Sequence, residues 1–335
     1  MKVYITGSSA ITPQHTFNAE SYLEHWVEHE QQYQQAMEPD YRNYIDPKQS
    51  RRMSRVIKMS VASAIKAMAR AGVDQPDAII VGTGLGCITD TEKFLLNIIQ
   101  EDEGVLSPTA FIQSTHNTIA GQLALLLQCP NHNLTYANRG HSFENALVDA
   151  TLYLQEGAAH VLTGGVDEMT PTVFDIMQKM GYAGVAGQPK WGEGAAFFVL
   201  SAQKSHNAVC LEDFHLFNNP VAEELDLMLS RFLAKNEVDA DQIDALIIGQ
   251  QDAQDLFYAR VLNHFTGIPV VNFKDITGEY FTASAFAYDL AKVMLQQQQV
   301  FKNELQPDNC KYSLGKVLIY NHYNGVNHSL ALLSI

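Results

Sequence analysis

The segment TYANRGHSFENALVDA, residues 135–150, carries the side chains best suited to chemistry. Its GHSFE sequence partly matches the GxSxG elbow that presents a nucleophilic serine, which makes Ser142 a candidate nucleophile. Glu144 replaces the last glycine of that motif, however. His141 is also a poor base for Ser142, because adjacent side chains at a helix start usually point apart. The alternative is that Ser142 only caps the helix that follows.

Arg139 stands at the mouth of the same expected helix. Backbone N–H groups and the helix dipole favour anions there, so a guanidinium at this point could help to hold a carboxylate, a phosphate or a pantetheine arm. Arg139 could instead form a structural salt bridge with Glu144 or Glu279. We favour the salt bridge.

Neither the histidines nor the cysteines predict a metal site. The twelve histidines are scattered and form no HExxH or HxH pair on one element. The four cysteines show neither metal spacing nor a disulfide pattern, so we expect reduced, mostly buried thiols. They are Cys87, Cys129, Cys210 and Cys310.

The glycine-rich sequence IIVGTGLG, residues 79–86, could be part of a dinucleotide-binding loop. No acidic residue follows it at the place where such a site binds a ribose. We therefore interpret Gly82, Gly84 and Gly86 as a tight turn under a packed neighbour. No cofactor is expected.

The elements that position these residues occur twice. VDQPDAIIVG (73–82) and VDADQIDALIIG (238–249) each give an acidic turn, a short apolar strand and a glycine, and each follows an amphipathic helical pattern. A unit repeated at half the chain length predicts two homologous α/β halves with a shared core. No Pro, Gly or Ser-rich linker separates them, so we expect one compact body with halves at 1–201 and 202–335.

Composition excludes several function classes. The chain has 335 residues and a formal net charge of −15, which argues against broad affinity for nucleic acid or anionic lipid. No apolar run approaches the roughly 18 residues that span a bilayer. The first residues, MKVYITG, predict a strand rather than a secretory signal, so we expect a cytoplasmic protein.

Several segments, taken in order, resemble the β-ketoacyl-acyl-carrier-protein synthase branch of the thiolase superfamily, and together they cover most of the chain. They are VYITGSSAITP (3–13), MSRVIKMSVASAIKAMARAGV (53–73), IIVGTGLG (79–86), SPTAFIQSTHNTIAGQLALLL (107–127), VLTGGVDEMT (161–170), GEGAAFFVL (192–200) and NHYNGVNHSL (321–330). The resemblance implies a thiolase-like, layered α/β/α/β/α fold and a role in biosynthesis of the fatty acid or polyketide type.

The resemblance also implies that the catalytic groups of the family are missing. A count back from the strand at Val161 places Gly140 where the family carries its nucleophilic cysteine. Gln250 or Gln251 stands at the first histidine, and the KxxxGH motif reads KDITGE, which keeps Lys274 but ends in Glu279. Since enolate formation needs donors around the developing negative charge, a glutamate there should be inhibitory.

We therefore expect a protein that does not catalyse condensation on its own. It resembles the chain-length factors of aromatic polyketide, aryl polyene and flexirubin-type pathways, which pair with an active ketosynthase. That resemblance implies an acyl carrier protein and either a heterodimer or a homodimer. Phe111, Ile112 and Gln113 are our candidates for reaching the partner's acyl tunnel, although ordinary interface packing would explain them equally well.

Two further hypotheses remain open. The first is acyl transfer by Ser142, with Arg139, His141 and Glu144 lining its pocket. The second is a non-enzymatic scaffold that binds carrier protein through a basic stripe, because charges recur at steps of three and four residues on an otherwise acidic chain. The stripe comprises Lys48, Arg51, Arg52, Arg55 and Lys58.

Overall fold

The computed structural model describes residues 1–19, 23, 27, 31–101, 104, 108–181, 190–301 and 313–335. The strands of its large sheet are β1 (Val3–Ile11), β3 (Ala78–Gly82), β4 (His132–Tyr136), β5 (His160–Asp167), β7 (Gly194–Ser201), β8 (Val209–Asn218), β9 (Ala245–Ile248), β10 (Val270–Asn272), β11 (Lys316–Tyr323) and β12 (Asn327–Ser334). A small parallel pair joins β2 (Tyr33–Gln34) to β6 (Trp191–Gly192).

The helices alternate with these strands. They are α1 (Pro47–Ser50), α2 (Arg55–Ala71), α3 (Ile88–Gln100), α4 (Pro108–Gln113), α5 (Thr118–Leu126), α6 (Ser142–Gln155), α7 (Pro171–Lys179), α8 (Ala222–Lys235), α9 (Leu256–His264), α10 (Lys274–Thr277) and α11 (Ser284–Gln297). Short 3-10 turns lie at Tyr41–Asn43, Arg139–His141 and Ala240–Gln242.

The strand order confirms two repeated halves. The first half runs β1-β7-β5-β3-β4 and the second runs β8-β12-β11-β9-β10. In each half the first two pairings in this order are antiparallel and the last two are parallel. A short β1–β8 pairing at Val3–Ile5 joins the two halves edge to edge. The expected division at residue 201 falls between β7 and β8 and stays a prediction.

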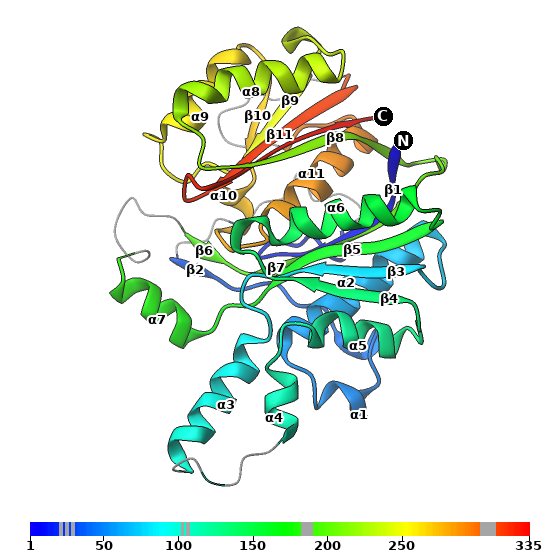
Figure 1. The fold of residues 1–335 in the computed structure, drawn as a ribbon, viewed down its shortest axis with the longest axis vertical. Coiled ribbons are helices and arrows are strands. Elements are labelled where there is room, and N and C mark those ends of the chain that lie inside the picture. Colours follow the sequence, from blue (N-terminus) through cyan, green and yellow to red (C-terminus); the bar gives the residue numbers. More distant parts are fainter. Residues whose placement is uncertain are drawn as a thin grey trace.

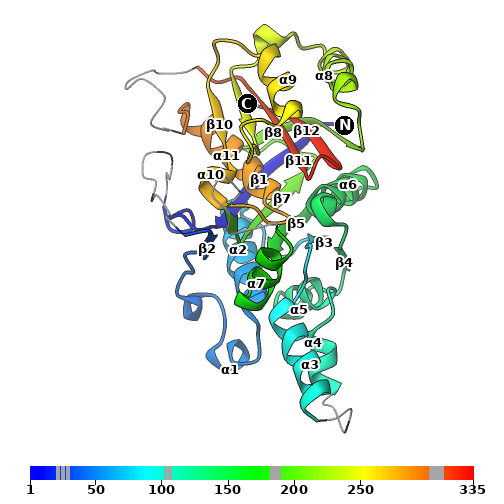
Figure 2. The same ribbon diagram turned by 90° about the vertical axis from the view of Figure 1, so that its left-hand side faces the viewer.

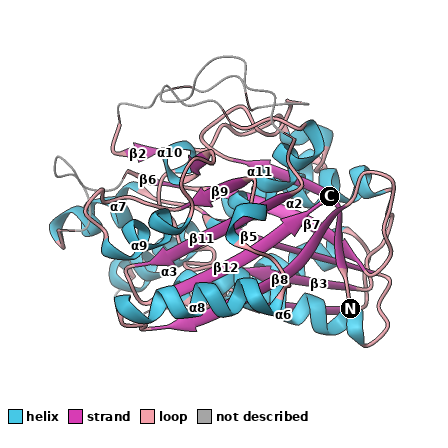
Figure 3. Ribbon diagram, turned by 90° about the horizontal axis from the view of Figure 1, so that it is seen from above, coloured by secondary structure: helices cyan, strands magenta, loops and turns pink. Residues whose placement is uncertain are grey.

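The helices form three layers around the strands, as Figure 1 shows. α6 and α11 lie between the two halves of the sheet, and their apolar side chains join both halves in one core. α2 and α5 cover the outer face of the first half, and α8 and α9 cover that of the second. Figure 3 shows α8 lying across strands β8, β11 and β12. The layered α/β/α/β/α fold predicted from the sequence is therefore confirmed.

Local sequence explains why these elements form. The helix α2 is amphipathic and ends at Gly72, whose φ of +67° suits the left-handed C-cap that glycine adopts without strain. All five residues of β3 are buried, as expected for a parallel strand with helices on both faces. α3 and α4 project away from the body in Figures 1 and 2, and the Phe94 and Phe111 rings, 5.5 Å apart, hold them together.

Buried carboxylates tie the loops around α6 to the sheet. Asp167, at the end of β5, accepts hydrogen bonds from the N–H groups of Gly84, Leu85 and Thr282 at 2.8 to 3.0 Å. It thereby links a loop of the first half to a loop of the second. These bonds give the start of α6 a fixed frame.

Candidate functional site

Gly140, the position expected for the cysteine, lies in the 3-10 turn Arg139–His141 immediately before α6. Tyr323, at the end of β11, packs against it. A Cβ added at Gly140 would lie 2.3 Å from the Tyr323 Cβ and 2.8 Å from its ring, closer than real contacts allow. Only glycine fits this turn while Tyr323 keeps its place.

Ser142 does not cap α6, so the alternative interpretation of this serine as a helix cap is wrong. It is the first residue of the helix, and His141 occupies the cap position. The Ser142 hydroxyl donates to the carbonyl of Arg139 at 2.7 Å and accepts from the N–H of Asn138 at 2.9 Å. It is fully buried. The hydroxyl therefore stabilises the turn that contains Gly140.

His141 points away from Ser142. Its Nε2 lies 3.0 Å from the carbonyl oxygen of His328, and this contact assigns the proton to Nε2. Burial lowers the pKa of His141, only partly opposed by that contact. Among the residues that the structure describes, none acts as a base towards the Ser142 hydroxyl, and the geometry does not favour acyl transfer by this serine.

Lys274 and Glu279 form a buried ion pair. The Lys274 Nζ donates to Glu279 Oε2 at 2.9 Å and to the carbonyl of His322 at 3.2 Å, and both side chains are at most 6% exposed. Burial raises the pKa of Glu279, and the Lys274 ammonium opposes that rise. The Lys274 ammonium compensates the charge of the Glu279 carboxylate. At this position the family has a histidine that can donate a proton, whereas here the carboxylate is held in an ion pair.

The expected salt bridge of Arg139 with Glu144 or Glu279 is wrong. Glu279 pairs with Lys274. Glu144 is buried on the inner face of α6, where its Oε1 accepts from the Ser329 hydroxyl at 3.2 Å. Within the described part of the chain, Arg139 forms no ion pair and its side chain is exposed.

A second imidazole at this site was missed by the sequence analysis. His322 Nε2 lies 2.9 Å from Asp255 Oδ2, and its Nδ1 accepts from the N–H of Gly325 at 3.1 Å. The Nε2 contact has the distance of an ion pair but not the alignment of a hydrogen bond. Burial would raise the pKa of Asp255, but the His322 ring and two backbone N–H groups outweigh it and lower that pKa.

These groups line a polar cavity of about 190 Å³, between α10, β9 and the loop that joins β11 to β12. Gln251 lines it too, whereas the Gln250 side chain bonds to the carbonyl of Asp252 at 3.0 Å. Tyr258 and Gly249 also line this cavity, and the Tyr258 hydroxyl donates a hydrogen bond to the Gly249 carbonyl at 2.7 Å. A histidine near the end of an apolar strand, within the glycine-containing segment NHYNG, was the sequence signal for His322.

The basic stripe is not one helix face. α1 ends at Ser50 and α2 begins at Arg55, so a turn separates Lys48 from Lys58. The Arg55 guanidinium is already bound to Glu193, which is fully buried, and to Glu38, and these bonds do not favour a docking role for it. Lys48, Arg51 and Arg52 are exposed. Their docking role stays a prediction.

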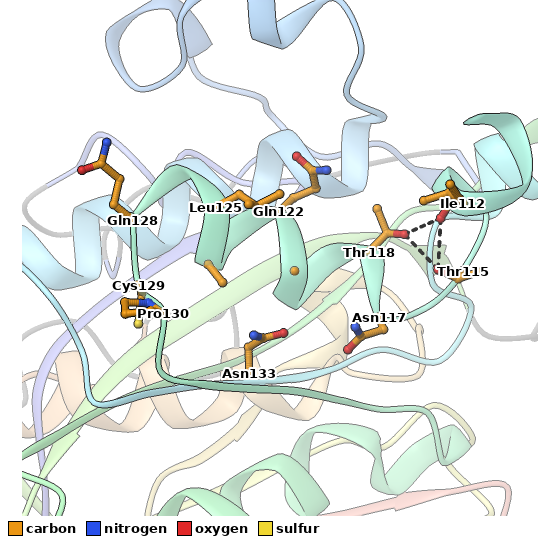
Figure 4. Close-up of a pocket in the computed structure, with 12 residues that line it drawn as sticks. Ile112, Thr115, Asn117, Thr118, Gln122, Leu125, Gln128, Cys129, Pro130 and Asn133 are labelled. Carbon is orange, nitrogen blue, oxygen red and sulfur yellow. Dashed lines mark hydrogen bonds between the residues drawn. The ribbon is translucent and has the colours of Figure 1, made fainter. Parts of the chain in front are cut away.

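The outer edge of β4 carries no further strand within the described residues, because β4 is last in the strand order. Beside it, α5 and the start of β4 line a surface groove of about 610 Å³ that also reaches Ile112 (Figure 4). Phe111, Ile112 and Leu125 are 57%, 63% and 73% exposed. This face joins an unpaired strand edge to exposed apolar side chains.

The described residues form neither a metal-binding cluster nor a membrane-spanning helix. No group of three or more His, Cys, Asp and Glu side chains is placed to hold a metal in the described segments. No helix there combines the length and the hydrophobicity of a membrane span. Cys87, Cys129 and Cys210 are buried free thiols, while Cys310 lies outside the described residues.

A family model described as the N-terminal domain of β-ketoacyl synthases matches residues 24–223, more than half of the chain. The chain belongs to the β-ketoacyl synthase family. No curated protein matches it in sequence. Membership of this family confirms the resemblance that the ordered motifs predicted.

Solved structures of the same family share the fold. A β-ketoacyl synthase from Burkholderia phymatum matches with a TM-score of 0.79 at 15% identity, over 100% of this chain and 99% of the other. The ishigamide ketosynthase/chain length factor gives 0.78 at 16% identity, over 99% and 98%. A ketosynthase in complex with its chain length factor from Xenorhabdus doucetiae gives 0.76 at 14%, over 100% and 98%. The chain therefore has the ketosynthase fold.

Proposed function

We propose that this β-ketoacyl synthase relative is a non-condensing partner of an active ketosynthase, in the manner of a chain-length factor, and that it works with an acyl carrier protein. The observation that carries the proposal is the contact between Tyr323 and Gly140. It fills the space in which a nucleophilic side chain would stand at the start of the buried helix α6.

The chemistry of condensation needs a thiolate to accept the acyl group and donors to stabilise the enolate that forms on decarboxylation. At the matching positions this chain offers Gly140 and the closed Lys274–Glu279 pair. Glu279 carries a negative charge, or is neutral only at the cost of its bond to Lys274. Neither state assists an enolate.

The face around β4 supports the pairing. The family joins its dimers through sheet edges, and here the unpaired edge lies beside α4 and α5. The apolar side chains Phe111, Ile112 and Leu125 are exposed next to it. Burial of such side chains is the main favourable contribution to association.

The proposal is tested by co-expression of the chain with an intact ketosynthase from the same organism. We expect a stable heterodimer by native mass spectrometry and products that require both chains. Phe111→Trp should shift the product-length distribution towards shorter chains, because a larger side chain at the partner's tunnel leaves less room. The matched control is Leu256→Trp on α9, which enlarges a side chain of similar exposure, 69%, far from β4.

Full condensation by either chain alone would contradict the proposal. So would the absence of a heterodimer together with binding of carrier protein, which would instead favour the scaffold hypothesis. In that case Arg51→Glu with Arg52→Glu should abolish carrier binding, since both side chains are exposed beside α1. A cytoplasmic location belongs to the same proposal and is tested by cell fractionation.

A further inference from the structure

A second cavity, of about 320 Å³, is lined in part by Tyr323, and Asn324 lines both this cavity and the polar one. Five of its seven lining side chains are apolar or aromatic, among them Met177, Trp191 and Phe281. Its volume is near the lower end of the roughly 300–1,000 Å³ typical of small-molecule sites. Such walls would cover an apolar ligand of modest size.

Arg139 is the one charged side chain that lines this cavity in the described part of the chain. Two carboxylates of the neighbouring polar cavity already have partners, since Glu279 pairs with Lys274 and Asp255 with His322. A guanidinium with five N–H donors and no carboxylate partner suits bidentate binding of an oxyanion. The charge of the cavity therefore favours an anionic ligand.

The backbone at Arg139 adds an independent observation. Its φ of +48° lies in the left-handed region, where residues other than glycine, asparagine and aspartate are uncommon. The turn is held in this conformation by the two hydrogen bonds of the Ser142 hydroxyl. Strained backbone conformations that surrounding bonds maintain cluster at ligand sites.

We propose that this cavity binds an anionic group, a carboxylate or a phosphate monoester, that is joined to a short apolar body. Arg139 binds the anion, and the ring and thioether walls contact the apolar part. The inference goes beyond the proposed pairing and does not depend on it, because the cavity lies within a single chain. Ligand binding and heterodimer formation are separate measurements, so either can fail alone.

The test is calorimetric titration of the full 335-residue chain with octanoate, octyl phosphate and octanol. We expect at least one of the two anions to bind at least tenfold more tightly than octanol. The anion that binds more tightly shows whether the cavity prefers a carboxylate or a phosphate monoester. Arg139→Ala should weaken that anion at least tenfold and leave octanol unchanged. Alanine and arginine both carry a Cβ, so a positive φ strains the backbone of either residue to a similar extent. This variant therefore removes the guanidinium without added backbone strain.

Two controls keep the result interpretable. Arg231→Ala removes an exposed arginine on α8, far from the cavity, and should leave anion binding unchanged. Arg139→Lys keeps the charge, should retain part of the anion preference, and shows by thermal unfolding whether the turn still folds. Failure of both anions to bind the wild-type chain, or equal binding by wild type and Arg139→Ala, would overturn the inference.

Discussion

Glu144 tests how strongly burial in the core of this fold disfavours an ionised carboxylate. Its side chain is fully buried on α6, and Oε2 has no hydrogen-bond partner in the described structure. Burial raises the pKa of Glu144 from its ordinary 4.5 to about 7, although the hydroxyls of Ser284 and Ser329 oppose the rise. The folded protein therefore holds a proton here that the unfolded chain releases near pH 4.5.

The sign and size of the effect follow from proton linkage. A carboxyl whose folded pKa is raised contributes its full stability below the unfolded pKa and loses it as pH rises through the folded pKa. At about 1.36 kcal/mol per pKa unit, ionisation of Glu144 costs the folded state about 3 kcal/mol by pH 8. Glu144→Gln keeps the shape and stays neutral. It should therefore be up to about 3 kcal/mol more stable than wild type at pH 8, with a difference under about 1 kcal/mol at pH 5.

Urea denaturation at pH 5, 6, 7 and 8 measures this difference. The matched control is Glu156→Gln at the exposed end of the same helix, which should change stability by less than about 0.5 kcal/mol at every pH. Some pH dependence should survive in Glu144→Gln, because burial also raises the pKa of Glu168 to about 7. A Glu144→Gln variant that is less stable than wild type at pH 8, or that has the same pH dependence, would refute the reasoning.

Two further substitutions test the Gly140 and Lys274 positions. Gly140→Cys should destabilise the fold by about 1–3 kcal/mol, because its Cβ would overlap Tyr323, and should acquire no acyl group from a carrier thioester. Thermal unfolding and intact mass check this, and a stable variant that becomes acylated would contradict it. Lys274→Met should cost about 3–5 kcal/mol in urea denaturation, because it leaves Glu279 buried without its partner. A loss under about 1 kcal/mol would show that the pair contributes little.

The architecture was predictable because its signals are local and occur twice. The apolar runs that became β3 and β9 each follow an amphipathic helix, α2 or α8, and this pattern alone predicts a repeated α/β unit. The alternation of helix and strand does not predict the antiparallel pairing of β5 with β7, which α7 separates in sequence. The five-layer arrangement was implied by the family resemblance.

The site was less predictable because its decisive contacts join residues far apart in sequence. Tyr323 reaches Gly140 only when the end of β11 meets the turn before α6, and nothing in either segment specifies that contact. Arg55 illustrates the same difficulty. Its spacing in the sequence places it in a basic surface stripe, but in the fold its guanidinium pairs with the buried carboxylate of Glu193. Spacing of charges along the sequence does not reveal which of them the fold will pair.

The central claim is that this chain forms no thioester of its own and acts through a partner. Its most direct test is intact mass spectrometry of the chain and an active ketosynthase, incubated together with an acyl-loaded carrier protein. We predict an acyl mass shift on the ketosynthase and none on this chain. An acyl group on this chain, at Ser142 or at any cysteine, would contradict the account.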